Sequence, residues 1–127
     1  MIDLHIHTNN SDGSDSVIDV LKKAQKHELS YMSITDHESV NGHYELRNID
    51  VKQYFSGKII PGVELKNYYK DRVIDILAYN IDIDKFNEYL EKNYKNKTHR
   101  MLETKNLKHL YKQAKAYGLT LDPIEEI

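Results

Sequence analysis

Segments with a strand pattern alternate with helical or turn-forming segments along residues 2–80 of this chain. Residues 2–7 alternate apolar and polar side chains, which predicts a strand at the start of the chain. Residues 29–35, 58–65 and 72–80 predict three further strands. Because helices between strands usually connect parallel neighbours, this alternation favours an α/β fold with a largely parallel sheet.

Helical spacing of apolar residues marks the segments between these strands. Residues 14–27 predict a helix that Ser14 or Asp15 can cap, with one buried face formed by Val17, Val20, Leu21 and Ala24. Residues 43–51 predict a second, weaker helix. These two helices would connect the first three strands and cover their sheet.

The length favours a single domain over residues 1–127. Its motifs lie in residues 1–80, and residues 84–118 predict a helical tail with a break near 96–98. A closed β/α barrel typically needs about 250 residues. The pattern is therefore that of the N-terminal half of such a barrel, which leaves a missing C-terminal half or a homo-oligomer to cover its open edges.

The composition excludes several classes of protein and site. The chain has no Cys, which excludes disulfides, thiolate zinc sites and Cys nucleophiles. Its net charge of -2 gives no broad basic field, so charge alone does not argue for binding to nucleic acid. No apolar run approaches the ~20 residues of a membrane span, and the N-terminus lacks a secretion-signal pattern. We therefore expect a cytoplasmic protein with no membrane partner.

Polar side chains follow or end the first three predicted strands. They are His5, His7, Asp12, Asp36, His37 and Glu64. Side chains two apart on a strand share a face, and the carboxyl ends of parallel strands meet at one edge of an α/β fold. Imidazoles and carboxylates that converge there form a mixed nitrogen and oxygen ligand set, which suits zinc, manganese or iron.

Each of these residues taken alone also has a purely structural explanation. A His-x-His pair is often a surface feature, Asp36 can cap the following helix, and Glu64 can be an exposed strand end. Asp12 before Gly13 is an ordinary turn residue. The metal-site interpretation depends on all of them lying at the same end of their strands.

Four short motifs carry a family resemblance. They read His5-Ile6-His7-Thr8, Ser11-Asp12-Gly13, Ile34-Thr35-Asp36-His37 and Pro61-Gly62-Val63-Glu64. In this order and at this spacing they resemble the first motifs of the PHP (polymerase and histidinol phosphatase) superfamily, in particular its stand-alone metal-dependent phosphoesterases. The resemblance implies a distorted (β/α)7 barrel with two or three divalent metal ions, manganese, zinc or iron, at the strand ends.

The resemblance also implies a role for each matched residue. His5 and His7 would bind the first metal, and the catalytic carboxylate Glu64 would bridge the first and second metals. Asp12 and His37 would hold the third metal. Asp36 would act from behind the ligands and orient His37 or a metal-bound water.

Two departures from the family pattern affect the ligand set. Many relatives have a His ligand on the strand after the bridging Glu, where this chain has Asp75. Asp75 is either a substitute oxygen ligand or a solvated strand residue. The family's later ligands, a His and a closing Asp-x-His pair, would lie beyond Ile127.

The remaining histidines are weaker candidates. His43 follows the strand ends closely enough to be a possible substrate contact, although a structural role is also open. His27 lies near a helix C-terminus, where its charge complements the helix dipole. His99 and His109 belong to the helical tail, and we expect them to be solvated.

Two functions from different classes are consistent with these observations. The first is a metal-dependent phosphoesterase in which metal-activated hydroxide hydrolyses a small phosphomonoester, a nucleotide or an oligonucleotide. The alternative is a truncated, non-catalytic PHP-like module that binds metal or a partner protein. Without its later ligands, this chain alone could be an inactive part of such an enzyme.

Overall fold

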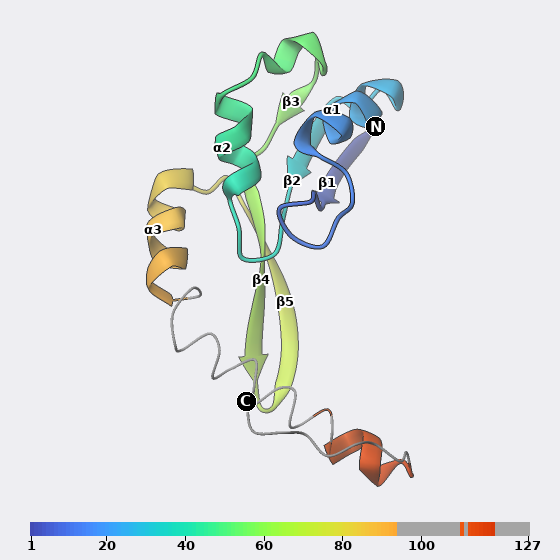
Figure 1. Cartoon of the computed structure of the whole chain (residues 1–127), viewed down its shortest axis with the longest axis vertical. Coiled ribbons are helices and arrows are strands. Elements are labelled where there is room, and N and C mark those ends of the chain that lie inside the picture. The colour runs from blue at the N-terminus through green and yellow to red at the C-terminus, as the bar shows by residue number, and fades with distance from the viewer. Residues whose placement is uncertain (94–109, 111, 119–127) are drawn as a thin grey trace.

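A computed structural model describes residues 1–93, 110 and 112–118 of the chain (Figure 1). Within residues 1–93 it contains strands, α-helices and one 3-10 helix. In chain order these are β1 (Ile2–Ile6), α1 (Val17–Lys26), β2 (Tyr31–Ile34), α2 (Asn41–Arg47), the 3-10 helix η1 (Val51–Gln53), β3 (Lys58–Ile59), β4 (Gly62–Tyr69), β5 (Arg72–Tyr79) and α3 (Ile83–Asn93).

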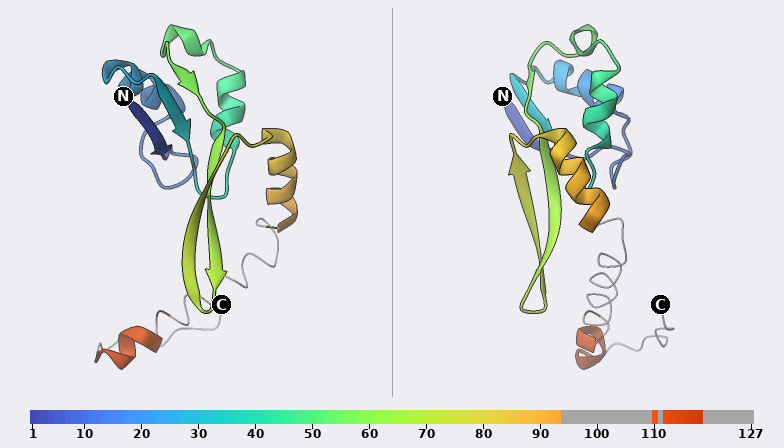
Figure 2. Two further views of the ribbon diagram at one scale, coloured as in Figure 1. Left: turned by 180° about the vertical axis from the view of Figure 1, so that it is seen from behind. Right: turned by 90° about the vertical axis from the view of Figure 1, so that its left-hand side faces the viewer.

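A parallel sheet with the strand order β1-β2-β3 forms the first part of the fold. Both helices that connect its strands lie on the same side of it, as the right-hand view of Figure 2 shows. The core between sheet and helices contains the predicted face of α1, residues of β2 and one aromatic ring: Val17, Val20, Leu21, Ala24, Met32, Ile34 and Phe55. The sequence prediction of parallel strands connected by helices is confirmed for this part of the chain.

The N-cap of helix α1 lies two residues after the first predicted cap, Ser14. Ser16 is its N-cap, and the Ser16 hydroxyl accepts a hydrogen bond of 3.1 Å from the Asp19 backbone N–H. The helix ends at Lys26, and the left-handed backbone of Glu28, with φ of 55°, then turns the chain toward β2. His27 is exposed at this C-terminus, in agreement with a structural role.

The predicted strand over residues 58–65 is divided in two, which corrects the sequence prediction. Pro61 lacks a backbone N–H and separates β3, in the parallel sheet, from β4, in a second sheet. The strand that we expected to continue a largely parallel sheet, β5, instead pairs antiparallel with β4. Lys70 and Asp71 connect the two strands and both have positive φ, which is the geometry of a tight hairpin turn.

The hairpin of β4 and β5 extends away from the parallel sheet (Figure 1). One face of its base packs against α2 and α3 through a second core made of Val40, Val63, Ile83 and Leu90. Arg47 of α2 adds an ion pair of 2.9 Å to Asp84 at the start of α3. The helices therefore occupy one face of the hairpin base and leave the other face toward β1.

Part of the predicted helical tail is present. Helix α3 covers its beginning, and residues 110 and 112–116 are also helical. The predicted break near 96–98, His99 and His109 lie outside the described residues. Among the described residues, no helix has both the length and the apolar character needed to cross a membrane. The single-domain boundary and the half-barrel stay predictions.

Removing the side chain at the centre of the first core should destabilise the fold strongly. Leu21 is completely buried between α1 and the sheet. We expect Leu21→Ala to lower the free energy of unfolding by about 2–5 kcal/mol, because it removes apolar contacts and leaves a cavity. Urea denaturation followed by circular dichroism measures this loss. Lys26→Ala, on the exposed side of the same helix, should change the value by less than about 0.5 kcal/mol.

Candidate metal centre

The Glu64 carboxylate lies at the centre of the candidate site. Its residue is only 6% exposed, at the start of β4. Two imidazoles from the end of β1 contact the same carboxylate oxygen: His5 Nε2 lies 3.0 Å and His7 Nε2 lies 2.6 Å from Glu64 Oε2. His37 Nε2, from the loop after β2, lies 3.6 Å from the same atom. Three histidines from two strand ends thus surround one carboxylate.

Backbone contacts place Glu64 beside the end of the parallel sheet. The Glu64 N–H donates to the Asp36 carbonyl at 3.1 Å, and the Glu38 N–H donates to the Glu64 carbonyl at 3.0 Å. These two bonds form a short parallel bridge between His37 and Glu64. The hairpin is therefore fastened to the sheet at the residue that carries the central carboxylate.

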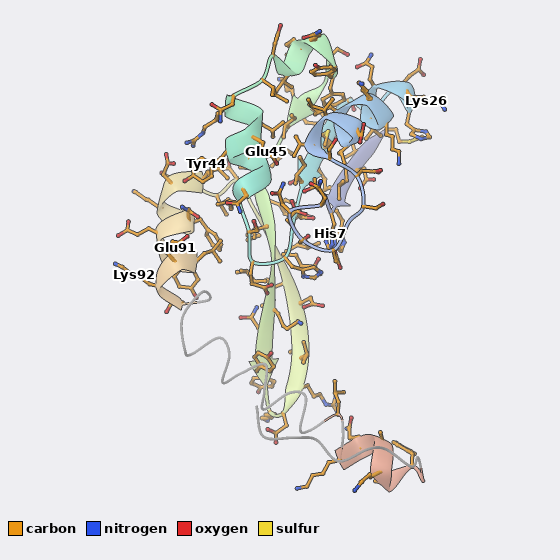
Figure 3. The ribbon with its side chains drawn as sticks, in the orientation of Figure 1. His7, Lys26, Tyr44, Glu45, Glu91 and Lys92 are labelled. Carbon is orange, nitrogen blue, oxygen red and sulfur yellow. The ribbon has the colours of Figure 1, made fainter. Side chains whose placement is uncertain are left out.

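The loop after β1 brings a second carboxylate to the histidines. Asp12 Oδ1 lies 2.5 Å from His7 Nδ1, and Asp12 Oδ2 lies 3.3 Å from His37 Nε2. The loop folds back on itself because the Ser11 and Gly13 N–H groups both donate to the Thr8 carbonyl. A Cβ at position 13 would lie 2.5 Å from the His7 carbonyl oxygen, so this close turn requires glycine. Figure 3 shows His7 beside this loop.

Asp36 holds the loop after β1, and the contacts among the described residues do not connect its carboxylate to His37. The residue is 1% exposed, and its carboxylate accepts hydrogen bonds from the Thr8 N–H at 2.6 Å, the Thr8 hydroxyl at 2.7 Å and the Ser11 hydroxyl at 2.7 Å. The structure thus corrects the expected orientation of His37, and the expected orientation of a metal-bound water stays a prediction. The partners of Asp36 instead make it a positioning residue for the loop that carries Asp12.

Asp75 lies with the other candidate ligands. The possible ligand atoms form three groups, and within each group the atoms lie within 4.8 Å of one another. His7, His37 and Glu64 each belong to two of the groups, which are His5, His7 and Glu64; His7, Asp12 and His37; and His37, Glu64 and Asp75. The hairpin explains the position of Asp75, since Glu64 pairs with Leu77 and Asp75 is two residues away on the same face of β5. All six sequence-predicted ligand side chains therefore meet in one place, and metal binding by them stays a prediction.

His43, in contrast, lies inside the protein. It is 6% exposed, and its Nε2 lies 2.9 Å from both the Ile34 and the Gly62 carbonyl oxygens. The ring thereby connects α2 to β2 and β4. A side chain that is buried and bonded in this way has no free surface for a substrate, so the structure corrects the expected substrate contact.

The structural partners of Asp36 were missed at the sequence level. Thr8 and Ser11 belong to the recognised motifs, but their hydroxyl groups had no assigned function. Asn10 also ties the loop to α2, because its amide donates to Glu45 at 2.6 Å. The available signal was the density of short polar side chains around a turn, which typically bond nearby backbone and carboxylate groups.

The charges of the cluster shift the pKa values of its members. Burial acts to lower the pKa of His7, but its hydrogen bond with Asp12 and the nearby Asp12 and Glu64 charges outweigh burial and raise the pKa above 6.5. The hydrogen bond with His7 lowers the pKa of Asp12. Burial acts to raise the pKa of Glu64, but the hydrogen bond with His5 and the three nearby histidines hold it below 4.5. The carboxylates are therefore ionised at neutral pH.

The donor set fits divalent cations. His7 Nε2 is buried and, among the described residues, has no partner in hydrogen-bond geometry, although it lies 2.6 Å from Glu64 Oε2. A short distance without a suitable angle is expected where two lone pairs are directed at a shared cation rather than at each other. Imidazole nitrogens together with carboxylate oxygens suit zinc, manganese or iron.

Binding of a metal by these residues should depend on pH. Protonated His7 cannot be a ligand, and its raised pKa means that it holds a proton above pH 6.5. We expect the manganese affinity, measured by titration calorimetry, to increase as the pH rises from about 6 to about 8. His7→Gln should weaken binding at least about tenfold and flatten this dependence. His27→Gln, at an exposed position, should keep both the manganese affinity and its pH dependence. An unchanged pH dependence in His7→Gln would contradict the assignment of His7 as a metal ligand.

The same pKa shifts determine how the stability of the metal-free protein changes with pH. Stabilisation from the raised pKa of His7 is complete below pH 6.5 and is lost as the pH rises through the folded-state pKa. Stabilisation from Asp12 is present above pH 3.8 and that from Glu64 above pH 4.5. Each is lost as the pH falls through the lowered folded-state pKa of that carboxyl group. Manganese should therefore stabilise the protein more at high pH than at low pH.

Neutralising Asp36 should disturb the loop that presents Asp12. Asp36→Asn replaces one acceptor oxygen by a donor that faces Thr8 and Ser11. We expect the free energy of unfolding to fall by about 1–3 kcal/mol and the manganese affinity to fall about 10–100-fold. Urea denaturation and metal titration measure the two effects. Asp50→Asn, an exposed change of the same chemistry, should alter neither quantity.

Comparison with curated proteins finds two related exoribonucleases. The 5′-3′ exoribonuclease Rnm of Escherichia coli (strain K12) is 31% identical over 81 residues, which are 64% of this chain and 28% of that protein. The Rnm protein of Salmonella typhimurium (strain LT2) matches with the same identity and coverage. The chain thus spans less than a third of the length of these relatives.

Solved structures show the same fold at low sequence identity. A protein from Bifidobacterium adolescentis, classed as a metal-dependent phosphoesterase, has a TM-score of 0.64 and 22% identity, with 79% of this chain and 35% of that chain covered. An amidohydrolase from Chromobacterium violaceum, solved with sulfate and without metal, has a TM-score of 0.66 and 21% identity. That match covers 94% of this chain and 40% of the neighbour.

A protein-family model identifies the chain as a whole. The model of the PHP domain matches residues 3–124, which include every candidate ligand from His5 to Asp75. This range is nearly the complete sequence, and it confirms the resemblance seen in the four motifs. The chain therefore belongs to the PHP domain family.

Proposed function

We propose that this chain provides the N-terminal metal-binding part of a metal-dependent phosphoesterase. One observation carries the proposal: three imidazoles, from His5, His7 and His37, converge on the buried Glu64 carboxylate within 3.6 Å. The buried Glu64 carboxylate would be costly to keep charged without bound cations or protonated imidazoles to balance it. Asp12 groups with His7 and His37, and Asp75 groups with His37 and Glu64.

The candidate ligands and Asp36 would have different roles in binding the metal ions. His5 and His7 would hold a first cation, His37 and Asp12 a further one, and Glu64 would bridge two of them. Asp75 would provide an oxygen ligand next to His37 and Glu64. Asp36 would keep the Asp12 loop in place through Thr8 and Ser11. Bound manganese, zinc or iron would supply Lewis acidity for the phosphoryl oxygens and lower the pKa of water toward about 7.

The substrate class that we favour is a nucleotide or oligonucleotide. Two relatives are named as exoribonucleases, and a fold neighbour is classed as a phosphoesterase. A small phosphomonoester is the second option, because the same cluster would accept any exposed phosphoryl group. The site does not require a Ser or Cys nucleophile, in keeping with the absence of Cys from the sequence.

Hydrolysis assays on the full-length gene product loaded with manganese test this proposal. We expect release of mononucleotides from a short single-stranded RNA, or of nitrophenol from p-nitrophenyl phosphate. Glu64→Gln should reduce kcat/KM by more than about 100-fold, because it removes the charge that bridges the cations. Glu88→Gln, on the exposed face of α3, makes the same chemical change and should leave activity intact.

Two outcomes would decide against phosphoester hydrolysis. Equal activity of wild type and Glu64→Gln would show that the cluster does not catalyse the reaction. Binding of manganese without turnover of either substrate would favour the alternative, a PHP-like module that binds metal or a partner protein without catalysis.

A further inference from the structure

A lysine follows Glu64 on the same face of the hairpin. Side chains alternate along β4, so Lys66 lies on the side of Glu64, about 6.7 Å further along the strand. Across the hairpin, Lys66 pairs directly with Asp75, the carboxylate that groups with His37 and Glu64. A cationic side chain therefore borders the candidate ligands on the strand that carries their central carboxylate.

The backbone of Lys66 is fixed relative to the metal centre. Its N–H donates to the Glu38 carboxylate at 2.5 Å, and the Glu38 N–H donates to the Glu64 carbonyl at 3.0 Å. The residue after His37 thus holds both Glu64 and Lys66. A four-carbon stem that begins at this anchored and half-buried position can present its ammonium group toward the ligands.

The structure describes every residue of the hairpin. By strand alternation, Lys66 is the one cationic residue on the hairpin face that carries Glu64. Lys70 lies in the turn, with its Nζ 5.3 Å from the centre of the Tyr69 ring. Arg72 pairs with Tyr69 on the opposite face. Neither of these two residues lies, as Lys66 does, on the Glu64 face of the hairpin between Glu64 and the turn.

Pairing with Asp75 does not account for the lysine. Within the described part of the chain, no carboxylate oxygen lies within 4.0 Å of Lys66 Nζ. Asp75 instead groups with His37 and Glu64, as a ligand would. The imidazoles and carboxylates of the cluster are all suited to holding cations, which leaves the ammonium of Lys66 to contact an anion.

We propose that Lys66 binds an anionic oxygen of the substrate's phosphoryl group while that group lies at the metal centre. The proposal rests on the proposed phosphoesterase function and adds a substrate-binding residue to it. An ammonium group donates charge-assisted hydrogen bonds to phosphate oxygens and acts as a compact positive charge. Lys66 would therefore increase affinity for phosphate esters without being a metal ligand.

Inorganic phosphate binding to the manganese-loaded full-length gene product tests this role without requiring turnover. We expect Lys66→Met to raise the Kd for phosphate about tenfold in titration calorimetry, because it removes one charge-assisted contact. Lys66→Arg should restore most of the affinity. Lys70→Met, which removes a lysine from the same hairpin, should bind phosphate like the wild type. Manganese content should stay the same in all three variants.

A second substitution guards against a folding defect. Lys66→Gln also removes the charge but keeps a polar side chain, and it should show the same weaker binding with an unchanged circular dichroism spectrum. In hydrolysis assays both neutral variants should raise KM more than they lower kcat. Wild-type phosphate affinity in Lys66→Met and Lys66→Gln, equal losses in Lys70→Met, or no phosphate binding by the wild type would each overturn the proposal.

The outcomes also separate this proposal from the general function. Binding of phosphate that depends on Lys66, in a protein that hydrolyses no phosphoester, would reject catalysis and keep the lysine's role. Hydrolysis that depends on Glu64, with phosphate binding indifferent to Lys66, would keep catalysis and reject the lysine's role.

Discussion

Two backbone hydrogen bonds between the loop after β2 and the start of β4 determine how this site is assembled. They join Asp36 and Glu38 to Glu64, and they fasten an antiparallel hairpin to the end of a parallel sheet. The Tyr79 hydroxyl adds a second attachment, since it donates to the Leu4 carbonyl of β1 at 2.6 Å. Because the hairpin is held at both strands, the Glu64 carboxylate faces the imidazoles of β1 instead of solvent.

Burying carboxylates beside this junction requires compensation, and the two buried acids obtain it differently. Asp36 is satisfied by hydrogen bonds from Thr8 and Ser11, so its charge stabilises a loop. Among the described residues, the side-chain groups that contact the Glu64 carboxylate within 4 Å are imidazoles, and these can neutralise it either as protonated partners or as co-ligands of a cation. The first acid is thus suited to structure and the second to binding.

The sequence allowed the ligand cluster to be predicted because strand ends are easy to locate from periodicity. His5, His7 and His37 lie near the points where a period-two pattern stops, and folds of this class bring such ends together. Glu64 was expected at the end of its strand, but it lies near the start of β4 and reaches the same place through the bridge to His37. The partners of Asp36 and the interior position of His43 depend on how loops and helices pack, which periodicity does not encode. The antiparallel direction of β5 results from a two-residue turn in which Lys70 and Asp71 both have positive φ. The residue types Lys and Asp do not predict this backbone conformation.

The turn between β4 and β5 also determines which side chains lie at the metal centre, although it is at the opposite end of the hairpin. Its two residues set the register in which Lys66 faces Asp75 and Glu64 faces Leu77. Shifting β5 by one residue would move Asp75 to the face that packs against α2 and α3, away from Glu64. The composition of the metal centre therefore depends on a tight turn at the opposite end of the hairpin, as well as on the residues that contact the ligands.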